Sequence, residues 1–166
     1  DGSSFWCRNL AKAIDMGDGS RSAIWIAEDI TERKEAEASM RRLLLEQRAI
    51  LENASVGILF TCDGIIMHCN PRMEAMFKWE PGTLAGHRAN TFFVDDDDYA
   101  RFGAAAQPTL AANQLLDIEW SNVRRDGTSI WCRHLARSID LGDGRRSAVW
   151  ITEDITARKA TEEALH

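Results

Sequence analysis

Apolar and polar residues alternate over several short segments of this chain, which is the pattern of β-strands with one buried face. Turn sequences such as Asp63-Gly64 and Gly142-Asp143-Gly144 separate these segments. The strands that we predict, in chain order, cover residues 56–61, 65–69, 115–123, a run that begins after residue 127, and 147–153.

Helical segments are expected between the second and the third of these strands. Asn70-Pro71 begins the first, because Asn caps a helix N-terminus and Pro fits the first helical turn. Pro81 and Gly86 divide the next stretch into short helical pieces, and the acidic residues 95–98 cap a longer, alanine-rich helix. The order of strand, strand, helices and three strands predicts an α+β domain with an antiparallel sheet.

A further helical segment covers residues 32–52, which contain strong helix formers and neither Gly nor Pro. Apolar residues recur there at helical spacings and charges fill the other faces, so the predicted helix is amphipathic. It is either a short parallel coiled coil or a helix laid along its own domain. Residues 157–166 begin a second helix of the same kind.

The chain contains an internal repeat. Residues 1–11 return as residues 126–136, and the match continues without a gap through residue 156 at a constant offset of 125 (126 minus 1). A period of this length is domain-sized. We therefore predict that residues 1–31 are the closing hairpin of a preceding unit and residues 53–156 a complete unit, in a fragment or processed chain that begins without Met. An isolated hairpin is marginal in water, so the first one should be frayed, packed on a neighbour or swapped into another copy.

Composition limits the classes of function. The formal net charge of -6 argues against nucleic acid or an anionic membrane surface as a partner, because both attract clustered Lys and Arg. No apolar stretch approaches the ~20 residues of a membrane-spanning helix. The four cysteines form no CxxC pair, so we expect reduced thiols in a cytoplasmic protein.

Several short motifs occur together in residues 51–156. They are Leu51-Glu-Asn-Ala-Ser-Val-Gly-Ile58, Asp63-Gly64 followed by Cys69-Asn70-Pro71, Trp79-Glu-Pro-Gly-Thr-Leu-Ala-Gly86, Val94-Asp-Asp-Asp-Asp-Tyr-Ala-Arg-Phe102, and Arg124-Arg-Asp-Gly127 with Trp131 and Asp154-Ile155-Thr156. In combination these motifs resemble those of the PAS family of sensor domains, and the last of them resemble the PAC motif that closes a PAS domain.

The resemblance implies a five-stranded antiparallel sheet with helices on one face, wrapped around a small cavity and flanked by amphipathic linker helices. It also implies tandem PAS units in a multidomain bacterial signalling protein, with an output domain such as a histidine kinase or a diguanylate cyclase in the same chain. PAS units sense a ligand, redox state or light, or simply dimerise, and they pass their state on through the exit helix. Since no nucleophile–base pair or metal signature supports an enzyme, we expect a non-catalytic module.

The resemblance argues against the two standard chromophores of the family. Haem-binding members place a proximal His on the long helix, and residues 99–113 contain none. Flavin photosensors carry a Cys in the segment that corresponds to residues 87–93, which contain none either. The cofactor is therefore left unassigned.

By analogy with the family, the cavity is lined from the third, fourth and fifth strands of the unit. The candidate ligand-binding residues are Ile118, Trp120, Cys132, His134 and Trp150, with Trp131, Leu135 and Ile139 facing outward. The opposite assignment of faces stays open, because a slip of one residue inverts them. Two inward tryptophans favour a filled core or a small ligand.

His134 stands out among these residues. It is either a sensor of a ligand or a proton, or a core histidine satisfied by a backbone group. Together with Cys132, His68 and Cys69 it shows no recognised metal-ligand spacing, so no metal is expected.

The junction between the last strand and the exit helix is the second candidate site. Asp154 and Thr156, like Asp29 and Thr31 in the first copy, can bond backbone groups there and relay a signal. We thus expect a cytoplasmic sensory and signal-relay module that forms a homodimer through linker helices or its sheet face. The alternative is a ligand-free module for dimerisation or protein interaction.

Overall fold

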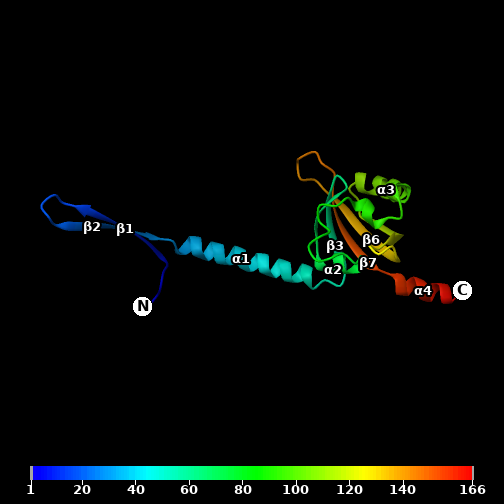
Figure 1. The fold of residues 1–166 in the computed structure, drawn as a ribbon, viewed down its shortest axis with the longest axis horizontal. Helices are drawn as coiled ribbons and strands as arrows, with labels where there is room; N and C mark the ends of the chain where they lie inside the picture. Colours follow the sequence, from blue (N-terminus) through cyan, green and yellow to red (C-terminus); the bar gives the residue numbers. More distant parts are fainter. Residues whose placement is uncertain (1, 166) are drawn as a thin grey trace. The chain divides into compact units, whose positions relative to one another are not determined.

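The computed structural model describes residues 2–165 (Figure 1). Residues 1 and 166, the outer ends of the predicted segments 1–31 and 157–166, lie outside the described part. The chain divides into two compact units, Asp1–Ala49 and Ile50–His166, which we call the N-terminal and the C-terminal unit and describe separately.

The N-terminal unit holds an antiparallel hairpin and most of a long helix. Strand β1 (Cys7–Asp15) pairs with β2 (Arg21–Asp29), and helix α1 (Thr31–Glu52) begins two residues after β2. All residues of β2 are exposed, and so are the apolar residues along α1. The hairpin is formed, but a partner that covers its apolar side chains stays a prediction.

The C-terminal unit is built on one five-stranded antiparallel sheet, which confirms the predicted fold class. The strands are β3 (Gly57–Cys62), β4 (Ile65–Cys69), β5 (Leu116–Val123), β6 (Ser129–Ile139) and β7 (Ser147–Asp154). Their order across the sheet is β4-β3-β7-β6-β5. The two early strands therefore join the three late ones through the pairing of β3 with β7.

The internal repeat extends from sequence to strand pairing. Cys132 on β6 pairs with Asp154 on β7, as Cys7 on β1 pairs with Asp29 on β2. Both hairpins therefore have the same register. They differ in burial, because alternate residues of β6 are buried whereas β1 is almost wholly exposed.

Four helical elements complete the C-terminal unit, and two of them start at the predicted caps. Asn70 caps α2 (Pro71–Met76), and Asp95 caps α3 (Asp96–Ala111) by accepting the amide of Asp98 at 2.8 Å. The 3₁₀ helix η1 (Ala89–Phe92) precedes α3, and α4 (Thr156–Ala164) follows β7. None of the helices in residues 2–165 combines the length and the apolar content needed to cross a bilayer.

The stretch around Pro81 differs from the prediction, because it contains turns instead of short helical pieces. Lys78, Gly82 and Gly86 all have positive φ angles, of 58°, 78° and 91°. Such angles interrupt a right-handed helix, so the chain turns repeatedly before η1.

The core lies between the sheet and the helices α2, η1 and α3. Its most deeply buried large side chains are Ile66, Met73, Phe77, Leu84 and Ile130, each at most 1% exposed. Phe77 contacts Phe92 with ring centroids 4.4 Å apart, so the end of α2 packs directly on η1.

Candidate functional site

The C-terminal unit contains a cavity of about 1060 Å³. The side chains that line its interior from β3, α3, β6 and β7 include Leu59, Phe102, Ala106, His134 and Trp150. Exposed residues Asp63, Asp140 and Arg145 also take part in the lining, so the cavity opens to solvent at that end.

His134 lines this cavity and is held by side chains of the two neighbouring strands. Its Nε2 lies 2.8 Å from Oδ1 of Asn122 on β5, and its Nδ1 lies 3.1 Å from Oγ1 of Thr152 on β7. Since Asn122 Nδ2 donates to the carbonyl of Phe92 at 3.1 Å, Asn122 Oδ1 is the acceptor. We therefore assign the tautomer in which His134 Nε2–H donates to Asn122 and the Thr152 hydroxyl donates to His134 Nδ1.

We call Asn122, His134 and Thr152 the polar triad. Burial lowers the pKa of His134 to about 4, because the charged ring would lose its hydration. The side chain is only 6% exposed, and its ring lies 5.5 Å from that of Phe102. The triad is therefore uncharged at neutral pH.

The five predicted ligand-binding residues separate into two groups. His134 and Trp150 line the cavity, and Trp150 Nε1 donates to Thr61 Oγ1 at 3.0 Å. The other three lie on the same face of the sheet but belong to the core beside the cavity; they are Ile118, Trp120 and Cys132.

The core position of two of these residues has chemical consequences. Trp120 Nε1 donates to Asp98 Oδ1 at 3.3 Å, which ties β5 to the start of α3. Cys132 is 0% exposed, and burial raises the pKa of its thiol to about 12. This thiol therefore stays protonated and behaves as a small core side chain.

Among the residues predicted to face outward, Trp131 and Leu135 are half-buried and alternate with the buried residues of β6. Ile139 departs from the prediction, because it contributes to the cavity lining. Its neighbour Ser138 does so as well, which shows that the alternation of faces stops where β6 ends at the mouth of the cavity.

The sequence analysis missed Asn122 and Thr152. Each lies two residues beyond an inward tryptophan, Trp120 or Trp150, and so has the inward parity. Their polarity at inward strand positions could have identified them as hydrogen-bond partners of His134, because buried polar groups require partners. The expectation that a backbone group satisfies His134 is wrong, since both ring nitrogens bond to side chains.

Metal ligands do not gather in the part of the chain that the structure describes, where no three His, Cys, Asp or Glu side chains form a candidate site. Both nitrogens of His134 are engaged in hydrogen bonds, so this ring offers no free lone pair to an iron. No cysteine occurs among the described residues of the cavity lining. Among the described residues, the lining thus offers neither a free histidine nitrogen to haem iron nor a cysteine thiol for attachment of a flavin.

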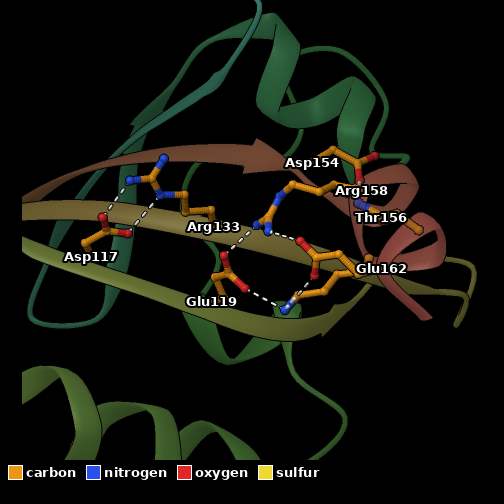
Figure 2. A network of polar contacts seen from close by, with 8 residues as sticks. Asp117, Glu119, Arg133, Asp154, Thr156, Arg158 and Glu162 are labelled. Atoms are coloured by element: carbon orange, nitrogen blue, oxygen red, sulfur yellow. Dashed lines mark hydrogen bonds and ion pairs between the residues drawn. The ribbon is translucent and has the colours of Figure 1, made fainter. Parts of the chain in front are cut away.

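The strand–helix junction has a recurring geometry. The amide of Thr156 donates to Asp154 Oδ1 at 2.9 Å, and Thr156 Oγ1 accepts from the amide of Trp131 at 3.1 Å. Asp29 and Thr31 make the same two bonds at the start of α1, at 3.0 and 3.1 Å. Figure 2 shows Asp154 and Thr156 where β7 gives way to α4. These residues connect the end of one strand, the start of the helix and the neighbouring strand.

The chain is similar in sequence to a curated sensor protein. The chain is 24% identical over 116 residues to the sensor protein TdiS of Thauera aromatica; the match covers 70% of this chain and 21% of that protein. The chain thus spans only about a fifth of the length of the relative.

Two solved PAS domains show the fold. One, from a LuxR-family transcriptional regulator of Burkholderia thailandensis and described in complex with ethanol, has a TM-score of 0.60 and 23% identity, covering 65% of this chain and 96% of its own. The other, from an HTR-like protein of Haloarcula marismortui, has a TM-score of 0.62 and 21% identity, covering 74% and 99%. PAS domains are typically non-catalytic sensory modules. The family model of the PAS fold matches residues 45–155, and the chain therefore belongs to the PAS fold family.

Proposed function

We propose that this chain is a sensory and signal-relay module that takes a small ligand into its cavity. In this proposal the resulting change passes through α4 to an output domain in the same chain, where any catalysis resides. The observation that carries the proposal is a cavity of about 1060 Å³ lined by the uncharged polar triad.

The lining favours a compact, uncharged and largely apolar ligand. Aromatic rings of Phe92, Phe93, Tyr99, Phe102 and Trp150 contribute to it. Asp63 and Arg145 lie at the exposed end and pair with each other at 2.9 Å. The other charged residues of the lining, Arg88, Asp140 and Arg146, are exposed as well, so a charged ligand in the buried part of the cavity would lose its hydration without gaining an opposite charge there. The ethanol held by the matched Burkholderia domain is a neutral molecule, in keeping with this class.

The polar triad also supports a relay role. Thr152 lies two residues before Asp154 on the same strand, so a ligand that disturbs the triad acts close to the junction with α4. The signal would then leave the domain through the helix whose start Asp154 and Thr156 hold in place.

A ligand-free module for dimerisation or protein interaction is the second candidate. It is favoured by apolar side chains that remain exposed: Ile151 on the sheet is 38% exposed, and Leu43 and Leu44 on α1 are 56% and 58% exposed. We propose that a second copy covers one of these surfaces under either function. Nucleic acid and membranes are not among the proposed partners, and a cytoplasmic location stays a prediction.

Filling the cavity tests the choice between these functions. Ala106 on α3 lines the cavity and is 3% exposed, so Ala106→Phe should occupy ligand space and lower ligand occupancy by about tenfold or more. Native mass spectrometry before and after denaturation should show a small-molecule mass on the wild-type chain and little on this variant.

Ala105→Phe is the matched control, because Ala105 is the exposed neighbour on the same helix. This variant should keep the wild-type ligand mass. A wild-type chain that carries no releasable mass, and that has the mass of a dimer, would favour the ligand-free module instead.

The junction yields a separate prediction. Replacing Asp154 by Ala removes one hydrogen bond at the start of α4 and an ion pair with Arg124 at 3.7 Å, which should cost about 0.5–2 kcal/mol and leave the fold intact. The activity of the output domain in the full-length protein should then no longer follow the sensory input. Asp143→Ala is the control, since Asp143 accepts the amide of Arg145 at 3.0 Å in a loop away from the helix. Equal signalling by the two variants would contradict a relay role for Asp154.

A further inference from the structure

Helix α4 begins with a charge pattern that its own dipole disfavours. Arg158 and Lys159 lie in its first turns, and the first turn contains no acidic residue. The N-terminus of a helix carries a partial positive charge, so basic side chains there are destabilising unless an anion lies nearby. The position of these two residues therefore calls for an acidic partner outside the first turn.

Glu119 on β5 is that partner. Its Oε1 lies 2.5 Å from Nη2 of Arg158, and its Oε2 lies 2.7 Å from Nζ of Lys159. Both carboxylate oxygens are thus used by α4, as Figure 2 shows for Arg158. β5 is the edge strand of the sheet, and β6 separates it from β7. The ion pairs therefore reach from the helix after β7 across β6 to the edge of the sheet.

Two further contacts extend the cluster. Nζ of Lys159 lies 5.1 Å from the ring centroid of Trp131 on β6, which is cation–π distance. Glu162, one turn further along α4, lies 2.7 Å from Nη1 of Arg158. Hydrogen bonds from Lys159 and Arg158 hold the pKa of Glu119 below its ordinary value. The cluster is therefore charged at neutral pH.

Helix α1 carries the same basic pair at its start, in Arg33 and Lys34. Both pair along the helix with Glu37, at 3.7 and 3.9 Å, and Lys34 Nζ lies 5.8 Å from the ring centroid of Trp6, the counterpart of Trp131. Glu37 is the counterpart of Glu162 at the offset of 125 residues (162 minus 125). If Arg158 leaves Glu119, it keeps Glu162 as a partner, as Arg33 keeps Glu37. Release from the sheet therefore leaves the charge of Arg158 paired on the helix.

We propose that Glu119 is a latch that holds α4 against the sheet in one of two states, docked or released. This inference rests on the proposed function only in taking α4 as the exit element. The side chains of Glu119 and Arg158 are 33% and 46% exposed, so each ion pair is weak and salt-sensitive. A latch of this strength can be opened by the modest differential binding of a small ligand, whereas a buried ion pair could not.

The latch is tested on the 166-residue chain by NMR and amide hydrogen exchange. In the docked state the ring current of Trp131 should shift the side-chain methylene protons of Lys159 upfield. Glu119→Gln should reduce this shift and speed exchange of the α4 amides about three- to tenfold, because two charged pairs are lost. Raising salt from 0.1 M to 1 M should move the wild-type chain in the same direction, since the screening length falls from about 10 Å to 3 Å.

Asp117→Asn is the matched control. Asp117 lies on the same strand and face as Glu119, two residues away, and pairs with Arg133 at 2.6 Å instead of with the helix. The Asp117→Asn variant should leave the Lys159 shift and the rate of α4 amide exchange at wild-type values. Glu119→Lys should release α4 further, and adding Arg158→Glu should restore part of the docking by reversing one pair.

These readouts need neither ligand nor output domain, so they are independent of the proposed function. If Glu119→Gln and Asp117→Asn leave the Lys159 shift and the α4 exchange equally unchanged, the latch is excluded, although the cavity can still bind ligand. If both variants release α4 equally, the edge strand as a whole and not Glu119 holds the helix, which also overturns the proposal.

Discussion

Replacing Asn70 by Ala should lower the free energy of unfolding of the C-terminal unit by about 3–5 kcal/mol, since groups left unpaired in the interior cost about 1–3 kcal/mol each. The side chain is 5% exposed and makes four hydrogen bonds. Its Oδ1 accepts from the amides of Ile58 at 2.8 Å and Met73 at 3.0 Å. Its Nδ2 donates to the carbonyls of Leu51 and Val56, both at 3.0 Å. One residue thus joins the end of α1, the start of β3 and the cap of α2.

Urea unfolding followed by tryptophan fluorescence would measure this loss. Asn90→Ala is the control, because the Asn90 side chain makes one exposed hydrogen bond, to Asp96 at 3.0 Å. The control should cost less than about 1 kcal/mol. If Asn70→Ala also lost less than about 1 kcal/mol of unfolding free energy, water would have to replace the four hydrogen bonds, and Asn70 would not be essential to the fold.

Acidification should destabilise the C-terminal unit well above the pH at which carboxylates titrate. The pKa of His134 is about 4 in the folded state, below the value of about 6.5 of an unfolded histidine. The unfolded state therefore binds the proton first, so stability is full above pH 6.5 and falls as the pH drops from there towards 4. The difference between the two pKa values corresponds to roughly 3 kcal/mol.

The variant His134→Asn isolates this effect, and it has a natural precedent because Asn9 occupies the equivalent place in the first copy. The variant should lose stability at neutral pH through its poorer fit in the polar triad, but its stability should hardly change between pH 6.5 and 4.5. His87→Asn is the control, since His87 is exposed and its loss should leave the wild-type slope. An unaltered slope in His134→Asn would assign the pH dependence to another group.

The polar triad also connects the two regions that hold α4. Asn122 lies on β5 three residues after Glu119, and Thr152 lies on β7 two residues before Asp154. Under the proposed function, a ligand that displaces a triad hydrogen bond acts on both strands at once. The latch and the junction would then respond together, which is how a small molecule could change the state of a whole helix.

The local pattern of residues was sufficient to predict the fold class. The alternation along each strand, the Asn70-Pro71 cap and the acidic start of α3 are all set by a few adjacent residues, and the structure contains the elements that they predict. The inward face of β6 was expected by analogy, and the buried residues Cys132 and His134 lie on it. Breaks at Pro81 and Gly86 were predicted, but the turns that replace helix between them were not, because a positive φ angle leaves little trace in the pattern of apolar residues.

The sequence alone thus determined the order of strands and helices and the repeat, since these depend on spacings of two to four residues or on direct identity, whereas the inward face of the strands was assigned by analogy with the family. Only the tertiary structure decided which inward residues line a cavity and which fill the core. It also decided the partners of His134, which lie 12 and 18 residues away, and of Glu119, which lies 39 residues from Arg158. Such pairs depend on strand register and on the path of α4 after β7, and these arise from packing of the whole unit rather than from any local pattern.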